Sequence, residues 1–309
     1  MLHIIVNPKA GRGHTMDYIP LINNFLTKNN ITYKIYVTTK ILDGYDITKN
    51  ICTSNCSGIV GIGGDGTFQE IVAGLVDSFP RGEKIPCPLG IFAAGSGNDF
   101  IMSLEGSKKK ALERYKHPPE IIVENFFEAI FKGKTRTIDV ITANKMAYLN
   151  IGNIGLDAKI VRNAADLKRK FGRHAYTAAV YKTIVSHKNL PLTIEADGIK
   201  MDKQFTLVAM CNGMYYGGGL HLTPSARIDD GKITLCLVES MSRPKTMVLF
   251  PSLMIGKHTK LKPVSFLDCE EVTITLPPGE ETLCLDGNLY KTQGKIEFKI
   301  LKNILDVFI

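Results

Sequence analysis

The glycine-rich segment at residues 63–67, Gly-Gly-Asp-Gly-Thr, has the residue types and spacing of a phosphate-binding loop. It follows an apolar run, residues 59–62, and leads into residues that favour a helix. Backbone amides at a helix N-terminus bind phosphoryl oxygens when no side chain obstructs them. Thr67 and Glu70 have the spacing of a capping box, which predicts that the helix begins at the end of the glycine loop. Asp65 stands among these amides, where it can hold a metal ion directly or through water.

The same residues also fit weaker alternatives. Residues 61–66 satisfy G-x-G-x-x-G, but the dinucleotide fingerprint normally follows the first strand of its unit and needs an acid ending the second, and neither is clear. Gly133-Lys134-Thr135 resembles the end of a P-loop, yet Glu128 stands where the first glycine is required, which rules a P-loop out. A tight turn without a ligand also remains. Three glycines, an acid and a capping threonine together favour the phosphate site.

Two more glycine-bearing segments follow apolar runs of the same half. Residues 7–13 follow the run at 2–6, and residues 94–99 follow the run at 88–93. The carboxyl ends of parallel strands lie along one edge of a sheet, where open α/β proteins bind their ligands. Three such segments on one edge predict a nucleotide site.

The first third of the chain alternates short apolar strands with amphipathic helices, which predicts a mostly parallel sheet covered by helices. Strands are expected at residues 2–6, 31–38, 57–62 and 88–93, and a helix from about residue 16 tolerates Pro20 only in its first turn. After about residue 139 the pattern changes to strands punctuated by Asp-Gly turns, which is typical of antiparallel hairpins. These strands are expected at 146–151, 192–196, 205–210, 233–238, 272–276, 282–285 and 296–301, the turns at 197–198, 230–231 and 286–287, and one helix at 158–188.

The predicted fold class is therefore α/β plus β, with two packed domains and the active site in the cleft between them. Residues 1–138 form the expected nucleotide-binding α/β domain, and residues 139–301 form the β-rich substrate domain. The return of residues 302–309 to the first domain is left open.

Composition and charge limit the class of protein. The chain has 309 residues, 44% hydrophobic and 22% charged, which is ordinary for a globular protein, and its apolar runs are too short to span a bilayer. The N-terminus lacks a basic leader, so we expect a cytoplasmic protein. Seven irregularly spaced cysteines fit reduced thiols, and Cys52 and Cys56 have no matching pair for zinc. The net charge of +8 suggests an anionic partner, but no nucleic-acid-binding motif accompanies it.

Several blocks of the sequence, in order and across nearly the whole chain, resemble the diacylglycerol kinase catalytic family, which includes soluble bacterial lipid kinases and sphingosine and ceramide kinases. The blocks are NPKAGRG (7–13), GGDGTFQEIVAGL (63–75), GSGNDF (95–100), NIGLDA (153–158), YGGGLHLTPSARIDDGKI (216–233) and LDG (285–287). The resemblance implies a nucleotide-binding α/β domain of the NAD-kinase/diacylglycerol-kinase type followed by a β-sandwich-like domain.

The resemblance also implies roles for individual residues. The positions that match ATP contacts are Asn7, Pro8, Lys9, Ala10, Gly11, Thr38, Gly63, Gly64, Asp65, Gly66, Thr67, Phe68, Gln69 and Ser96. Asp65, Asp99 and Asp139 match aspartates that organise a catalytic Mg²⁺ ion and its waters. Asp286 matches the aspartate proposed to deprotonate the lipid hydroxyl. A separate structural metal site of some bacterial members corresponds to Asp230 and the backbone carbonyls of Arg227 and Lys232.

Some of these residues have simpler interpretations. Asp286-Gly287 and Asp230-Gly231 have the sequence of two-residue hairpin turns, and only the family context favours a base at Asp286. Asp139 fits a charge-paired loop acid equally well. The family usually has glutamate where this chain has Asn288, so an inactive or slow protein is an alternative if that glutamate is the base. The family's basic residue is also missing at 101–103, which removes one expected contact to a phosphate or lipid head group.

The resemblance implies a Mg²⁺-dependent lipid kinase that transfers the γ-phosphate of ATP to a lipid hydroxyl, with diacylglycerol as the first expected substrate. A NAD kinase-like enzyme and a nucleotide- or lipid-binding sensor are the alternatives. Residues 108–110, all lysine, and the basic residues at 168–173, aided by Leu167 and Phe171, suggest transient contact with a membrane surface, although a solvated helix face is the commoner role of such runs. A homodimer is left open.

Overall fold

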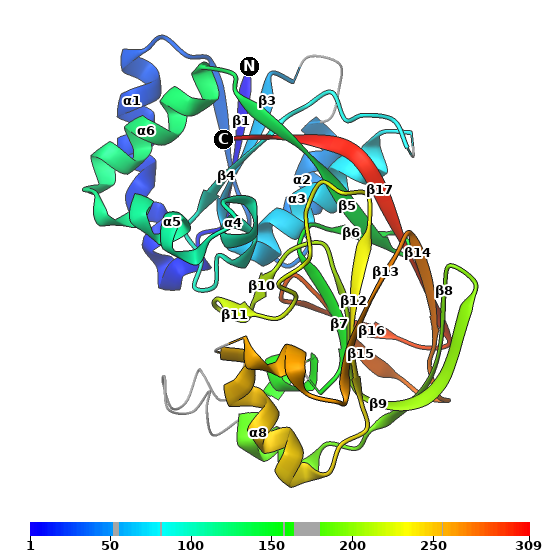
Figure 1. The fold of residues 1–309 in the computed structure, drawn as a ribbon. Helices are drawn as coiled ribbons and strands as arrows, with labels where there is room; N and C mark the ends of the chain where they lie inside the picture. The colour runs from blue at the N-terminus through cyan, green and yellow to red at the C-terminus, as the bar shows by residue number, and fades with distance from the viewer. Residues whose placement is uncertain (52–55, 81, 157, 164–179, 255) are drawn as a thin grey trace.

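The computed structural model describes residues 1–309 except 52–55, 81, 157, 164–179 and 255, and it divides into a helix-covered half and a β-rich half (Figure 1). The first half begins with four parallel strands in the order β4-β3-β1-β2. These are β1 (Leu2–Val6), β2 (Tyr33–Val37), β3 (Gly58–Gly63) and β4 (Leu89–Ala93). The helices and 3-10 turns of this half are η1 (Ala10–Asp17), α1 (Tyr18–Lys28), α2 (Asp43–Ile51), α3 (Asp65–Ser78), α4 (Asp99–Leu104), α5 (Lys108–Glu113), η2 (Arg114–Lys116) and α6 (Pro119–Phe131).

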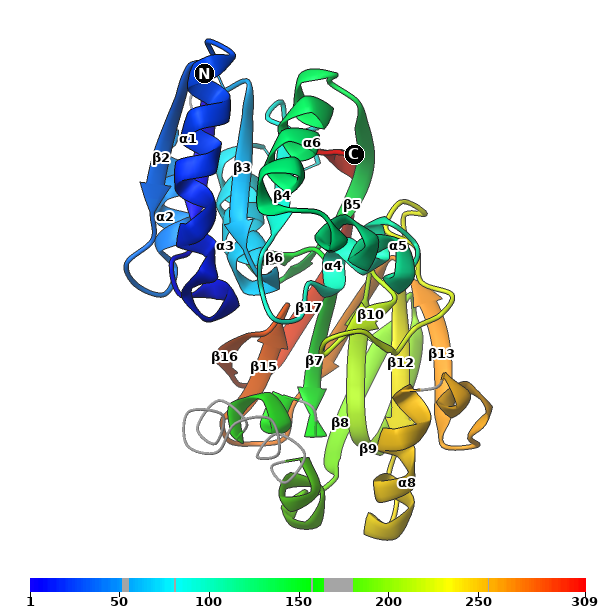
Figure 2. The same cartoon turned by 90° about the vertical axis from the view of Figure 1, so that its left-hand side faces the viewer.

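The parallel strands are apolar on both faces because helices cover both (Figure 2). Ile4 and Val60 belong to the core shared with α1 and α6, whereas Ile5 and Ile59 belong to the core shared with α3. Pro20 falls in the first turn of α1, as the sequence required. The alternating pattern of the first third is thus confirmed as a doubly covered sheet.

The β-rich half is antiparallel apart from its connection to the first sheet. Its strands are β5 (Thr135–Ala143), β6 (Met146–Tyr148), β7 (Ile151–Gly155), β8 (Leu190–Ala196), β9 (Ile199–Cys211), β10 (Tyr215–Tyr216), β11 (Leu220–His221), β12 (Ile233–Glu239), β13 (Val264–Cys269), β14 (Glu271–Thr275), β15 (Glu281–Leu285), β16 (Asn288–Thr292) and β17 (Lys295–Phe308). The helix α8 (Arg243–Met254) and the turn η3 (Lys257–Lys260) lie between β12 and β13.

Two of the three predicted Asp-Gly hairpin turns are confirmed. Residues 197–198 join β8 to β9, and residues 286–287 join β15 to β16, with positive φ at all four positions as a type I′ turn requires. The turn at 230–231 is different, because it precedes β12 and joins no pair of hydrogen-bonded neighbours. Its glycine amide instead donates a hydrogen bond to the Asp139 carboxylate.

Strand β17 connects the two halves. It pairs with β14 and β5, and its end returns to the first sheet, where Val307 pairs in parallel with Leu89 of β4. Beside this contact the amide of Ile85 donates to the carbonyl of Ile304 over 2.7 Å. The position expected for the domain boundary, residues 138–139, lies inside β5, so one continuous sheet runs through both halves.

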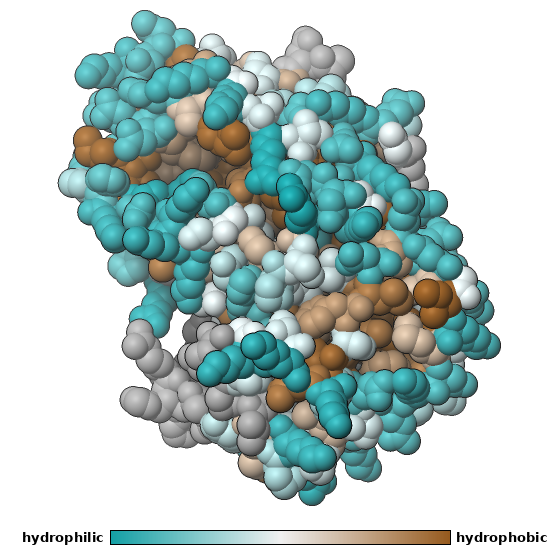
Figure 3. Space-filling model, viewed as in Figure 1, coloured by the Kyte–Doolittle hydropathy of each residue, from teal (hydrophilic) through white to brown (hydrophobic). Residues whose placement is uncertain are grey.

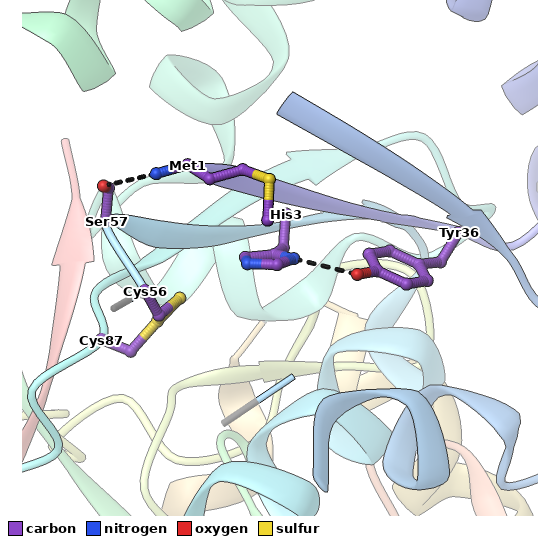
Figure 4. Close-up of a disulfide and its surroundings, with 6 residues drawn as sticks. All are labelled: Met1, His3, Tyr36, Cys56, Ser57 and Cys87. Carbon is purple, nitrogen blue, oxygen red and sulfur yellow. Dashed lines mark hydrogen bonds between the residues drawn. A yellow bond between two sulfur atoms is a disulfide. The ribbon is translucent and has the colours of Figure 1, made fainter. Parts of the chain in front are cut away.

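A disulfide joins Cys56 and Cys87 at the amino ends of β3 and β4, near the hydrogen bond from the Met1 amino group to Ser57 Oγ (Figure 4). The prediction that the cysteines are reduced thiols is therefore wrong for this pair. The two residues are 31 positions apart in sequence, and sequence spacing does not reveal such a pairing.

Part of the predicted 158–188 helix is confirmed, since residues 158–163 and 180–186 are helical. Other predictions lie outside the described residues. These are the intervening part of that helix, Cys52, and the basic segment Lys168-Arg169-Lys170 and Arg173 with Leu167 and Phe171.

Candidate active site

The carboxyl ends of β1, β3 and β4 surround a pocket of about 500 Å³. Of the predicted ATP contacts, those that line it are Asn7, Lys9, Ala10, Gly11, Thr38, Gly64, Gly66, Thr67 and Ser96. The five other predicted contacts do not line the pocket, namely Pro8, Gly63, Asp65, Phe68 and Gln69. Phe68 and Gln69 are buried, so their side chains support the loop from within the protein.

Glycines let the three segments approach one another closely. A Cβ on Gly95 would collide with Cα of Gly64, and a Cβ on Gly11, whose φ is +57°, would collide with the carbonyl oxygen of Ala94. A Cβ on Gly66 would lie 2.7 Å from Oδ1 of Asn288. The cradle therefore exists only because these side chains are absent, which leaves backbone amides open to a ligand.

Hydrogen bonds between distant residues fix the walls of the pocket. The amide of Asn7 donates to the carbonyl of Ile62 over 3.0 Å, which extends the sheet beyond β1. The Asn7 side chain donates to Thr67 Oγ1 over 3.0 Å, and its own Oδ1 accepts from the amide of Lys9 over 3.0 Å. The 7–13 segment is thereby attached to the first turn of α3.

The predicted capping box is wrong. Helix α3 begins at Asp65 with Gly64 as its N-cap, and no side chain caps its first amides. Thr67 already lies in the first turn, and the Glu70 carboxylate accepts from the amides of Leu42 and Gly44, each over 3.0 Å. Uncapped amides at this helix start suit an anionic ligand.

The charged side chains of the pocket lining are mainly cationic. Lys9, Arg12 and Lys40 line it, while Glu70 is the acid in the lining and is already bonded to backbone amides. Burial raises the pKa of Glu70, because the desolvation of its carboxylate outweighs the two amide bonds. This balance of charge favours a polyphosphate in the pocket.

Asp65 and Asp99 meet beside the glycine loop. Asp65 accepts hydrogen bonds from the amides of Asp99 (3.1 Å) and Phe100 (2.9 Å), so it caps α4. A Cβ at Gly97 would lie 3.0 Å from Oδ2 of Asp99 and 3.1 Å from Oδ2 of Asp65, which shows that the two carboxylates face one point. Burial raises the pKa of Asp65, and burial with repulsion from Asp65 raises that of Asp99 to about 7.

Asp99 is held from the other half of the protein by residues that the sequence did not single out individually. The amides of Gly218 (3.0 Å) and Gly219 (2.6 Å), between β10 and β11, donate to its carboxylate. One turn further along α4, Ser103 Oγ donates to Asn150 Oδ1 and accepts from the amide of Met214, both over 3.0 Å. The available sequence signal was the run of three glycines at 217–219. In the structure all three have positive φ.

Asp286 lies at the tip of the β15–β16 hairpin, where it is only 7% exposed. Its carboxylate accepts from the amides of Leu149 (2.7 Å), Asn150 (3.1 Å) and Ile151 (2.8 Å). Burial nevertheless raises the pKa of Asp286 to about 7, and the nearby charge of Asp65 contributes in the same direction. A carboxylate whose pKa is near 7 is suited to accept a proton at neutral pH.

Asn288 joins this hairpin to the glycine loop. Its Nδ2 donates to the carbonyl of Gly66 over 2.9 Å and to Gln69 Oε1 over 2.8 Å. Gln69 Oε1 also accepts from the hydroxyl of Tyr290 over 2.9 Å, and Gln69 Nε2 donates to the carbonyl of Ala147 over 2.8 Å. The loop from one half and the hairpin from the other are thus held in one network.

The structure does not bring Asp139 into a three-carboxylate group with Asp65 and Asp99. Among the described residues, no three acidic, histidine or cysteine side chains form a metal-binding cluster. The two oxygens of the fully buried Asp139 accept from the amides of Gly231 (2.6 Å) and Asn303 (2.7 Å). In these contacts Asp139 fastens β5 to the turn before β12 and to β17.

The residues of the expected second metal site lie in that same turn. Asp230 Oδ1 accepts from the amide of Lys232 over 3.1 Å, and burial raises the pKa of Asp230. Arg227 Nε is 3.7 Å from Asp229 Oδ1. A metal ion held there by Asp230 and the carbonyls of Arg227 and Lys232 stays a prediction.

The main pocket fits a nucleotide with a hard divalent cation. The glycine segments leave room for phosphates, and the lysine and arginine side chains around them supply positive charge. The Asp65 and Asp99 carboxylates repel each other, so a divalent cation that takes oxygen ligands would be favourable between them. Two protein carboxylates with the remaining ligands from phosphates and water is the usual arrangement for Mg²⁺.

Two family domains match the chain. The Diacylglycerol kinase catalytic domain matches residues 1–143, and the YegS C-terminal NAD kinase beta sandwich-like domain matches residues 151–308. The chain belongs to the diacylglycerol kinase family, and it is a lipid kinase with a nucleotide as its other substrate and a divalent metal implied. The predicted class of fold is confirmed by the same matches.

Curated relatives agree with this family, and solved structures agree with the fold. Diacylglycerol kinases of Staphylococcus aureus strains bovine RF122 / ET3-1 and MRSA252 are each 26% identical over 99% of this chain and 91% of their own length. A crystal structure of a candidate diacylglycerol kinase from Bacillus anthracis str. Sterne has a TM-score of 0.75 at 24% identity and covers 99% of this chain and 94% of the other. Another from the same strain, described as a diacylglycerol kinase, has a TM-score of 0.69 at 22% identity, covering 99% and 96%. No helix among the described residues is long and apolar enough to cross a membrane.

Proposed function

We propose that this protein transfers the γ-phosphate of ATP to the free hydroxyl of diacylglycerol, giving phosphatidic acid and ADP, with Mg²⁺ as the metal. The observation that carries the proposal is the single network that links the phosphate cradle, the Asp65–Asp99 pair and Asp286 across both halves. The names of the Staphylococcus aureus relatives support the choice of lipid.

In this proposal the glycine loop and the cations around it hold the polyphosphate. The uncapped start of α3 and the lysine and arginine side chains of the pocket bind phosphate oxygens. Asp65 and Asp99 would hold Mg²⁺, which neutralises the charge on the phosphates when it is bound. The protein contributes mainly position and charge, because the transition state of phosphoryl transfer is loose.

Asp286 is the proposed general base. As the lipid oxygen forms its bond to the γ-phosphorus, the bond from that phosphorus to the β–γ bridging oxygen breaks and ADP leaves. The hydroxyl proton passes to Asp286, whose pKa of about 7 matches the task at neutral pH. The amides of Leu149, Asn150 and Ile151 keep the carboxylate oriented.

The lipid is proposed to reach the site from a membrane surface, in a transient peripheral contact. Residues 108–110 are three exposed lysines in the first turn of α5. Lys108 Nζ lies 3.4 Å from the carbonyl of Gly218, in the loop that holds Asp99, so this basic segment is close to the site. Lysines so placed would attract anionic headgroups.

A phosphate-transfer assay tests the proposal. The purified chain is incubated with Mg²⁺, ATP labelled in the γ-phosphate, and in parallel diacylglycerol, a sphingoid base, total lipid extract or NAD. We expect label in phosphatidic acid only. Label in NAD alone would exclude a lipid substrate, and no transfer to any acceptor would indicate a binding protein that has lost its activity.

A further inference from the structure

A second cavity, of about 280 Å³, lies in the helix-covered half and is separate from the phosphate pocket. It is enclosed by β4, α4, η2, α6 and the end of β17. The space-filling view shows a brown hollow between α6 and α5, close to where the chain ends (Figure 3). Its deep wall consists of buried apolar side chains that include Phe92, Ile101, Leu104 and Ile122.

Most polar side chains of the lining are at least partly exposed at the mouth of this cavity, and they include the acid Glu105. Arg114, His117 and Asn125 line it and are at least partly exposed, and Arg114 forms an ion pair with Glu105. The Arg114 side chain is 35% exposed, so its charge faces the solvent as well as the cavity. A cavity with an apolar interior and a charged mouth suits an amphiphile that enters with its apolar end first.

The size of the cavity sets the length of that apolar end. An apolar cavity of about 150 Å³ binds benzene, with its six carbons, so the present cavity has room for roughly ten to twelve. Beside Phe92 and Ile130 the lining includes further apolar side chains, among them Ile91 and Phe126. An unbranched alkyl chain fits both the volume and the lining.

The charge of the surrounding segment indicates the sign of the head group. Residues 105–117, which run from the mouth through α5 and η2, contain four lysines and one arginine against two glutamates. Their field favours a negative head beside Arg114.

We propose that this cavity binds the alkyl chain, of about ten carbons, of an anionic amphiphile whose head group lies beside Arg114 and His117. The site backs onto the catalytic machinery. The hydroxyl of Tyr115 donates to the carbonyl of Ala93, the residue before the 94–99 segment, and Ile101 and Leu104 belong to the helix that begins at Asp99. A bound amphiphile would therefore contact β4 and α4, which flank the 94–99 segment of the phosphate pocket, without entering the phosphate pocket.

Calorimetric titration of the full chain with single-chain probes below their micellar concentrations tests this site. We expect affinity to rise about fourfold per methylene from hexanoate to decanoate, because each buried methylene adds a constant increment. Decanoate and decyl phosphate distinguish a fatty acid from a phospholipid as the source, and binding of either supports the site. Decanol is expected to bind at least threefold more weakly. Equal binding of decanol would refute the anionic head, and the absence of chain-length dependence would refute the site.

Two variants locate the binding. Ala129→Leu fills the cavity from α6 with a good helix former, and we expect a loss of at least tenfold in decanoate affinity. Glu124→Leu, an exposed position of the same helix, is the matched control and should bind as the parent does. Phe126→Ala enlarges the cavity, so the preferred chain should lengthen by several carbons. Undiminished binding by a folded Ala129→Leu would place the ligand elsewhere in the protein and would overturn the proposal.

Discussion

The exchange Asn288→Asp tests whether the two halves of the active site are held together by a carboxamide. The two side chains have nearly the same shape, but aspartate has no donor for the carbonyl of Gly66 and for Gln69 Oε1, which now accept at 2.9 and 2.8 Å. Each lost hydrogen bond costs about 0.5–1.5 kcal/mol, and an oxygen then faces two oxygens, so we expect a total loss of roughly 2–3 kcal/mol. At about 2–4 °C per kcal/mol for a chain of this size, Tm should fall by roughly 4–12 °C.

The same exchange should weaken nucleotide binding, because Asn288 lines the phosphate pocket. A carboxylate about 5 Å from one phosphate charge repels it by about 3 kcal/mol at an effective dielectric constant of about 20. If salt screens this repulsion to one third, about 1 kcal/mol, the affinity for ATP still falls about fivefold.

Thermal unfolding and titration with ATP measure the two effects, and Asn288→Ala separates them because it removes the donors without adding charge. We expect Asn288→Ala to lower Tm while changing ATP affinity less than Asn288→Asp does. If Asn288→Asp has the Tm and ATP affinity of the parent, the network does not hold the loop and the reasoning is wrong.

Four further predictions concern the same site. Asp286→Asn should lower kcat by about 10²–10⁴ if Asp286 is the base, and a steady-state rate equal to that of the parent would exclude that role. The pKa values of Asp99 and Asp286 are about 7 when folded against an ordinary value of 3.8, so their contribution to stability is present below about pH 4 and is lost as pH rises through 7. Tm of the metal-free protein should therefore fall from this cause between about pH 4 and 7. Asp99→Asn should make this fall less steep, and an unchanged pH dependence of Tm in that variant would contradict the assignment. Mg²⁺ should show the opposite trend and bind more tightly as pH rises toward 7, which isothermal titration at several pH values would detect. Gly95→Ala introduces a Cβ that collides with Cα of Gly64, so ATP affinity should fall at least tenfold, and a fluorescent-nucleotide titration that shows parental affinity would count against the cradle.

The sequence predicted the first sheet well because its signals are local. Strands that are buried on both faces must be continuously apolar, and the glycine segments mark their carboxyl ends, so residues 2–6 and 58–63 were found almost to the residue. The long strand β17 was predicted only over 296–301. Lys302 and Asn303 interrupt its apolar pattern, and the pairing with β5 shifts register between Leu301 and Leu305, so the continuation depends on a partner far away in sequence.

In the site, residue types were easier to predict than their partners. The Thr67–Glu70 spacing is that of a capping box, yet Thr67 bonds Asn7, 60 positions away, and Glu70 bonds the backbone at 42 and 44. Asp139 and Asp99 look alike as sequence, and only the tertiary structure separates a carboxylate held by Gly231 and Asn303 from one that faces Asp65. Long-range contacts of this kind have no local signature.

The return of β17 to the first sheet has a consequence for synthesis. The 304–308 segment pairs with β5 and touches β4, yet it leaves the ribosome long after residues 1–143. At about 5–20 residues per second, the edge of the nascent first sheet waits roughly 10–30 s for this strand. During that interval the side of β4 that later faces Val307 is an unpaired strand edge, open to other chains. Chaperone demand in the cell is therefore expected to peak before residues 304–308 emerge from the ribosome, and their pairing closes this edge of the sheet.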